Sequence, residues 1–144
     1  MDATFLQRKI VLPNDVQEVP KLAAFVDEVC EWMGFDPMLT MQLNLAIEEA
    51  VVNVMDYAYP PGTKGEVDIE VKADADELMF TISDNGVAFD PTAKAEVDTT
   101  LSAEERQIGG LGIYLVRQLM DDVEYERRDG RNILKLTKKL TKSK

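Results

Sequence analysis

The segment "LNLAIEEAVVNVMDYAY" (residues 43–59) makes up most of the longest helix that the sequence predicts, which starts near residue 36 and continues to about residue 58. Its apolar residues recur at helical spacing and form one stripe, as in a helix that packs on a core. Glu49 and Asn53 are four residues apart, so their side chains are neighbours beside that stripe, whereas Glu48 is expected to point toward solvent. The pair is either the solvated flank of a core helix or a carboxylate base beside an amide ligand for a cation such as Mg²⁺.

Length and composition predict a single domain over residues 1–144. Domains most often hold ~100–150 residues, and 45% apolar residues are enough to bury a core without disulfides or structural metals. The sequence has no apolar run near the ~18 residues of a membrane-spanning helix, and its N-terminus lacks a signal-peptide pattern. The single cysteine, Cys30, is expected to be an inert buried thiol. These features favour the cytoplasm.

Charge and the absence of histidine exclude several classes of function. The formal net charge of −11 argues against direct binding to nucleic acid or to an anionic membrane. It does not argue against a nucleotide, which needs only local donors and a metal. The chain contains no histidine, so Ser-His-Asp triads, histidine–metal sites and phosphohistidine cannot be formed by this chain alone.

The order of the predicted elements indicates an α/β fold. A strand over residues 4–12 is followed by a helix over residues 20–32, which ends at Gly34, and then by the long helix. Residues 65–74 and 77–86 alternate as two strands of a hairpin. A glycine turn opens a third helix over residues 109–122, and residues 123–140 form a closing hairpin that turns at Asp129-Gly130. We therefore expect a two-layer α/β (α+β) sandwich, with a mainly antiparallel mixed sheet and helices on one face.

Two further polar clusters follow the long helix. The first, "DNGVAFDP" (residues 84–91), is either an ordinary turn or a ligand loop in which Gly86 admits a close approach and Asp84 accepts a hydrogen bond from an exocyclic amine. The second, "GGLGIYLV" (residues 109–116), is either a hinge or an anion cradle made of backbone N–H groups at a helix start. It is neither a Walker loop nor a Rossmann fingerprint. The polar segment 91–108 between the clusters is long for a loop without a function.

The order and spacing of the three clusters resemble the GHKL ATP-binding superfamily, which includes gyrase, Hsp90, histidine kinases and MutL. The resemblance covers nearly the whole chain and implies the Bergerat ATP-binding fold. The short chain without histidine is most similar to the stand-alone serine/threonine kinases that act as anti-sigma factors. Their Asp-x-Gly-x-x-Phe-Asp-Pro box is matched by "DNGVAFDP".

This resemblance implies a role for each site residue. Glu49 would be the general base toward a protein serine, and Asn53 would coordinate Mg²⁺ on the ATP phosphates. Asp84 would bind the adenine amino group. Residues 91–108 would be the ATP lid. The adenine pocket would be lined by Gly86 and Ala88, and the nucleotide would also be held by Ile108, Gly109, Gly110, Leu111 and Gly112.

The sequence departs from the family pattern at three positions. Tyr57 stands where many relatives have histidine, and its ring is expected to pack. Asn132 is nearest to a threonine that usually supports the adenine-binding aspartate, and its amide can also form hydrogen bonds. Arg106 lies near the position of an arginine that touches the γ-phosphate in some relatives. These departures bear on kinase activity more than on ATP binding.

Three functions are compatible with the sequence. The first is an ATP- and Mg²⁺-dependent serine/threonine kinase that holds a sigma factor inactive and phosphorylates a small anti-anti-sigma protein of the STAS type. The alternative is an ATP-binding module that sequesters a partner without kinase activity. The third is a domain that phosphorylates another protein's histidine, or a nonregulatory ATPase. A homodimer is expected, which would form through the sheet or through the first helix. Four apolar residues of the first helix are either a dimer interface or part of the core: Phe25, Val29, Trp32 and Met33.

Overall fold

The protein is described here from a computed structural model, which covers residues 6–60, 62–93 and 111–140. Its centre is a five-stranded sheet in the order β1-β2-β3-β5-β4. The strands are β1 (Leu6–Pro13), β2 (Glu66–Ala73), β3 (Glu77–Asp84), β4 (Asp122–Arg128) and β5 (Arg131–Lys139). Every pairing between these strands is antiparallel. The expected antiparallel sheet is therefore confirmed, and the described strands include no parallel pair.

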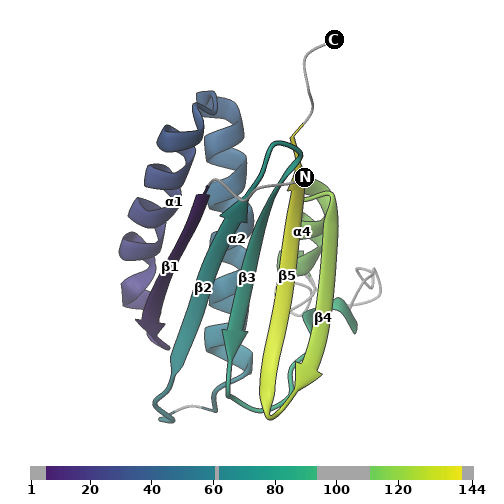
Figure 1. Ribbon diagram of the computed structural model, residues 1–144. Helices are drawn as coiled ribbons and strands as arrows, with labels where there is room; N and C mark the ends of the chain where they lie inside the picture. The colour runs from purple at the N-terminus through teal and green to yellow at the C-terminus, as the bar shows by residue number, and fades with distance from the viewer. Residues whose placement is uncertain (1–5, 61, 94–110, 141–144) are drawn as a thin grey trace.

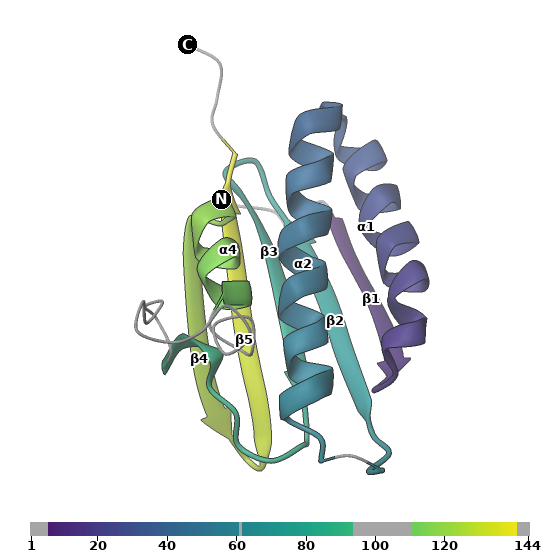
Figure 2. The same ribbon diagram turned by 180° about the vertical axis from the view of Figure 1, so that it is seen from behind.

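Helices cover one face of this sheet and leave the other face open, as Figures 1 and 2 show from opposite sides. They are α1 (Val19–Met33), α2 (Pro37–Tyr57) and α4 (Leu111–Leu119), and α2 lies between the other two. Two short 3-10 turns, η1 (Val16–Glu18) and η2 (Pro91–Ala93), complete the described elements. This arrangement is the two-layer sandwich that the element order predicts.

Local sequence signals set the ends of the helices. Gly34 adopts a left-handed conformation with φ of 76° and ends α1. The Asp36 carboxylate accepts a hydrogen bond from the Leu39 N–H at 2.8 Å, and Pro37 occupies the first turn of α2. At the closing hairpin, Asp129 and Gly130 have φ values of 55° and 77°, as a two-residue turn of the mirror-image type requires.

The core lies between the helices and the inward face of the sheet. The long stripe of α2 is buried there, and Cys30 and Val29 of α1 are each 1% exposed. Burial raises the pKa of the Cys30 thiol, in agreement with an inert core residue. Because Val29 is core and Phe25 is half-buried, the apolar group predicted on α1 is mostly packing rather than surface. Trp32 is its exposed member, with 53% of the residue accessible.

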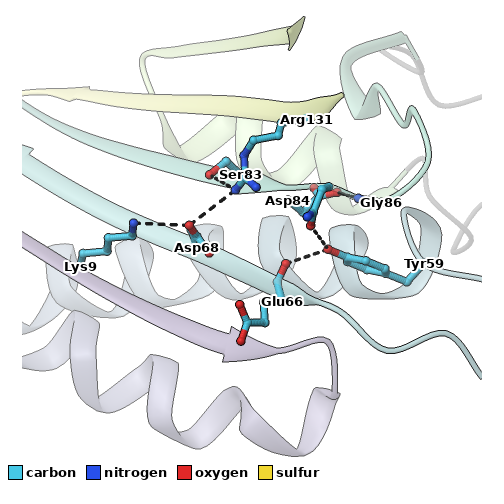
Figure 3. A network of polar contacts seen from close by, with 9 residues as sticks. Lys9, Tyr59, Glu66, Asp68, Ser83, Asp84, Gly86 and Arg131 are labelled. Carbon is cyan, nitrogen blue, oxygen red and sulfur yellow. Dashed lines mark hydrogen bonds and ion pairs between the residues drawn. The ribbon is translucent and has the colours of Figure 1, made fainter. Parts of the chain in front are cut away.

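The open face of the sheet carries a polar network that crosses four strands (Figure 3). Asp68 of β2 lies between the Lys9 ammonium and the Arg131 guanidinium, at 3.4 and 3.5 Å. Arg131 also donates to the Ser83 hydroxyl at 3.2 Å. Exposed ion pairs of this kind each contribute little to the free energy of unfolding.

Among the helices that the structure describes, none combines the length and apolar character needed to cross a membrane.

Candidate nucleotide-binding site

The register of the sheet brings three polar side chains into one row on the helix side. Asp84 of β3 pairs with Asn132 of β5, and Asn132 pairs in turn with Arg127 of β4. Paired residues of antiparallel strands project on the same face, so these side chains are neighbours although up to 48 residues separate them in sequence. The buried side chains of β3 that face the helices are thus apolar along the strand and polar at its end, at Asp84.

Asp84 is fully buried, and only one of its two carboxylate oxygens accepts hydrogen bonds from the described residues. Its Oδ1 accepts hydrogen bonds from the Gly86 N–H at 2.8 Å and from the Asn132 side-chain amide at 2.9 Å. Its Oδ2 is buried without a partner among the described residues. Burial raises the pKa of Asp84, although the Asn132 and Gly86 hydrogen bonds oppose the shift. A buried acceptor without a donor is costly, and a ligand amine would satisfy it.

Asn132 uses both ends of its amide. Its Nδ2 donates to Asp84 Oδ1 and, at 2.8 Å, to the Val87 carbonyl. Its Oδ1 accepts from the Phe89 N–H at 3.1 Å, from the Tyr125 hydroxyl and from Arg127 Nη1 at 3.1 Å. The expected contact between Asn132 and Asp84 is therefore present in the structure, and it is direct.

Tyr125 and Arg127 were not identified as site residues from the sequence. The signal was nevertheless available in the closing hairpin. A two-residue turn at residues 129 and 130 places Arg127 opposite Asn132, and strand alternation puts Tyr125 on the same face as Arg127. Predicting the hairpin was thus sufficient to place both side chains beside Asn132.

Gly86 has a packing role that was not predicted from the sequence. A Cβ atom at this position would lie 2.2 Å from the Ala58 carbonyl oxygen, at the C-terminal end of α2. The next residue, Val87, donates its N–H to the same carbonyl at 2.8 Å. Gly86 is therefore required for the loop after β3 to approach α2, independently of any ligand.

A ring contact also joins this loop to α2. The rings of Tyr57 and Phe89 stack with centroids 5.4 Å apart and an interplanar angle of 29°. The expectation that Tyr57 packs, in place of the histidine of many relatives, is confirmed. Phe89 belongs to the Phe-Asp-Pro part of the box, in which the Asp90 carboxylate accepts from the Thr92 N–H at 2.8 Å.

Glu49 and Asn53 lie one helical turn apart on α2. Asn53 is only 8% exposed, and its Nδ2 is buried without a partner among the described residues. Glu49 and Glu48 are both half-buried, so burial alone does not distinguish Glu48, which was expected to point toward solvent, from Glu49. Glu48 follows Asn44 by one turn, and Asn44 donates to Asp27 of α1 at 2.8 Å. The two glutamates therefore differ in direction, with Glu48 on the α1 side.

The remaining predicted residues are only partly described. Ala88 is exposed in the loop after Asp84, and Leu111 and Gly112 form the first turn of α4. Ile108, Gly109 and Gly110 lie outside the described residues, as does Arg106. Of the predicted lid over residues 91–108, the structure describes only Pro91–Ala93.

Comparison with known proteins places this geometry in a family. Residues 12–138 match the family described as the histidine kinase-like ATPase domain. The chain belongs to this family. Membership implies the use of ATP. It agrees with the buried Asp84 carboxylate at the end of β3, whose Oδ2 has no partner among the described residues.

Members of the histidine kinase-like ATPase family that resemble this chain include named kinases. The serine/threonine-protein kinase BtrW of Bordetella bronchiseptica is 35% identical over 99 residues, which cover 69% of this chain and 70% of that protein. The serine-protein kinase RsbW of Listeria monocytogenes is 35% identical over 105 residues, covering 70% and 67%. RsbW of Bacillus mycoides is 30% identical over 134 residues, covering 90% and 83%. These relatives favour a kinase over a sequestering module.

A solved structure shares the fold of this family member. It contains the RsbU and RsbW domains of Rv1364c from Mycobacterium tuberculosis, with a TM-score of 0.68 and 15% identity. The match covers 96% of this chain and 33% of that chain. It supports the antiparallel sheet with helices on one face.

The residues present fit a magnesium ion only in part. Within the described ranges no group of three or more Cys, Asp or Glu side chains could hold a metal. The unpartnered atom of the buried Asn53 amide is its nitrogen, Nδ2, which is a donor and cannot bind a cation. The amide oxygen of Asn53 is the atom whose chemistry suits a hard cation. Mg²⁺ commonly keeps few protein ligands and binds substrate phosphates, so a single side chain together with ATP is compatible with this site.

Proposed function

We propose that this chain is an ATP-dependent serine/threonine kinase that acts as an anti-sigma factor. It holds a sigma factor inactive and phosphorylates a small anti-anti-sigma protein of the STAS type. The observation that carries the proposal is the combination on α2 of half-buried Glu49 with the buried amide of Asn53, one turn away. The kinase names of the relatives support it.

The site residues divide the work of phosphoryl transfer among them. Asp84 Oδ2 accepts a hydrogen bond from the adenine amino group and so fixes the base. Asn53 would hold Mg²⁺ through its amide oxygen, and the ion would neutralise charge on the ATP phosphates. Residues 108–112 would bind the phosphates, and of these Leu111 and Gly112 begin α4, where helix N-termini favour anions. Little else is required, because phosphoryl transfer depends mainly on positioning and charge neutralisation.

Glu49 acts on the acceptor hydroxyl. The serine oxygen forms a bond to the γ-phosphorus while the bond from that phosphorus to the bridging oxygen breaks and ADP departs. The serine proton passes to the Glu49 carboxylate, or Glu49 orients the hydroxyl for attack. Within the described residues Glu49 has no hydrogen-bond or ion-pair partner that would compete for this role.

The net charge of −11 suits a protein partner with a basic surface. A homodimer and a cytoplasmic location also remain part of the proposal. The open, polar face of the sheet and exposed Trp32 on α1 are the surfaces on which such contacts would be sought.

The decisive experiment incubates the full chain with γ-labelled ATP, Mg²⁺ and the STAS-type protein encoded nearest to it. We expect label on the partner and phosphoserine or phosphothreonine after acid hydrolysis. Acid-labile label on histidine would support transfer to a histidine in trans instead. Partner binding that depends on ATP, without any transfer, would support the sequestering module.

A further inference from the structure

The orientation of the Asn132 side chain is determined by its neighbours. The oxygen receives three donors, namely the Phe89 N–H, the Tyr125 hydroxyl and Arg127 Nη1. The nitrogen faces two acceptors, Asp84 Oδ1 and the Val87 carbonyl. Reversing the amide would place a donor against three donors and an oxygen against two oxygens. A buried amide in this environment has one satisfiable orientation.

This orientation decides what Asp84 offers to a ligand. Asp84 Oδ1 is held by two donors, the Asn132 amide and the Gly86 N–H, while Oδ2 stays buried and without a partner. In its ionised form a carboxylate held in this way can only accept. The amino group at C6 of adenine is a donor, whereas guanine and hypoxanthine have a carbonyl acceptor at that position.

Two of the three donors to Asn132 come from side chains of β4. The half-buried Tyr125 donates to Asn132, and the exposed Arg127 donates to Asn132 and also to the Gly86 carbonyl at 3.0 Å. Arg127 thus holds both the amide and the loop that follows Asp84. Neither residue was among the site residues expected from the sequence.

We propose that Tyr125 and Arg127 are positioning residues for nucleotide selection, which act through the Asn132 amide to keep Asp84 a pure acceptor that selects a C6-amino purine. This inference rests on the proposed function, since it assumes that Asp84 binds the base. It assigns to β4 a part in ATP specificity that does not require contact with the nucleotide.

The test compares the binding of ATP and ITP, because the two nucleotides differ only along the C6–N1 edge of the base. Adenine has an amino group at C6 and an acceptor at N1, whereas hypoxanthine has a carbonyl group at C6 and an N–H at N1. Dissociation constants are measured by titration calorimetry with Mg²⁺ on the full chain and on Tyr125→Phe, Arg127→Gln and the double variant. We expect ATP affinity to fall roughly three- to tenfold in each single variant, the size of one lost hydrogen bond, with ITP affinity nearly unchanged. Arg127→Lys, which keeps a cationic donor, should recover part of the preference.

Matched controls separate this role from general stability. Arg128→Gln alters the neighbouring residue of β4, whose guanidinium pairs with Glu126, and Tyr114→Phe alters an exposed tyrosine of α4. Both should leave the ATP-to-ITP ratio at the wild-type value. Melting temperatures measured in parallel show that each variant is folded.

Two results would overturn the inference while leaving ATP binding by the wild type intact. One is an unchanged ATP-to-ITP ratio in the double variant. The other is an equal loss of affinity for both nucleotides, which would indicate a purely structural role. Failure of the wild type itself to bind ATP would overturn the proposed function, and this inference with it.

Discussion

Asp84 on β3 and Asn132 on β5 are directly opposite each other in the sheet, and the Asn132 side chain donates to Asp84 Oδ1 at 2.9 Å. The carboxylate is therefore held by a strand pairing as well as by the Gly86 N–H of the loop that follows it. Sites supported by paired strands keep their geometry more accurately than sites supported by loops. This contact connects the stability of the fold with the capacity to bind a nucleotide.

The first prediction concerns the stability of Asp84→Asn as a function of pH. Burial raises the folded-state pKa of Asp84 above the ordinary value of 3.8, so ionising this group opposes folding. That cost is absent well below pH 3.8 and increases as the pH rises through the folded pKa. We expect the variant to be more stable than the wild type at neutral pH, by an amount that shrinks as the pH falls.

Urea unfolding of both proteins at a series of pH values measures this difference. Subtracting the two curves removes most contributions of the other carboxylates. A variant that is less stable at neutral pH, by the same amount at every pH, would contradict a buried carboxylate with a raised pKa. In the same variant ATP affinity should fall, because the acceptor for the adenine amine is altered.

The second prediction concerns Gly86→Ala. The new methyl group would lie 2.2 Å from the Ala58 carbonyl oxygen, and a backbone atom at the end of a helix cannot move aside cheaply. We expect a loss of about 2 kcal/mol or more in the free energy of unfolding, as for other overpacked sites. Chemical denaturation measures it.

Gly130→Asn is the matched control for this glycine. Gly130 has a positive φ, of 77°, and nothing lies within 4 Å of a Cβ atom there, and asparagine tolerates the left-handed conformation. Its cost should stay below about 1 kcal/mol. Equal losses for the two variants would show that contact with α2 is not the reason for glycine at position 86.

The third prediction separates the two adjacent glutamates of α2. Glu49→Gln should lower phosphoryl transfer by roughly a hundredfold or more, the usual effect of removing a general base, while ATP affinity changes little. Glu48→Gln should retain near wild-type transfer, because Glu48 lies on the α1 side of the helix. Initial rates of transfer from labelled ATP measure both effects. If Glu48→Gln were the less active variant, Glu48 and not Glu49 would be the general base.

The fourth prediction concerns the contact between Tyr57 and Phe89. Tyr57→Ala removes a ring whose centroid lies 5.4 Å from that of Phe89. A stacked pair contributes roughly 0.5–1.5 kcal/mol beyond the burial of its area, and the variant also loses the buried area of the ring, so thermal unfolding should show a loss of at least that size. Tyr57→Phe, which keeps the ring, should unfold at nearly the wild-type temperature, and a loss equal to that of Tyr57→Ala would point to the hydroxyl instead.

Much of the architecture could be predicted from local spacing. The cap at Asp36, the left-handed Gly34 and the Asp129-Gly130 turn each lie where the sequence indicates, because their geometry depends on a few neighbouring residues. The proximity of Asn132 to Asp84 was expected from the family resemblance. The strand order β1-β2-β3-β5-β4 was not predicted, since it depends on which strands meet after a long connection.

By itself, the sequence determined the helices, the hairpins and the polar residues available for a site, since turn chemistry and hydrophobic periodicity act over a few residues. Only the tertiary structure decided what those residues contact. Gly86 meets the Ala58 carbonyl because the loop after β3 packs on the end of α2. Asn132 is oriented by Tyr125 and Arg127 because strand register, not sequence distance, sets which side chains are neighbours.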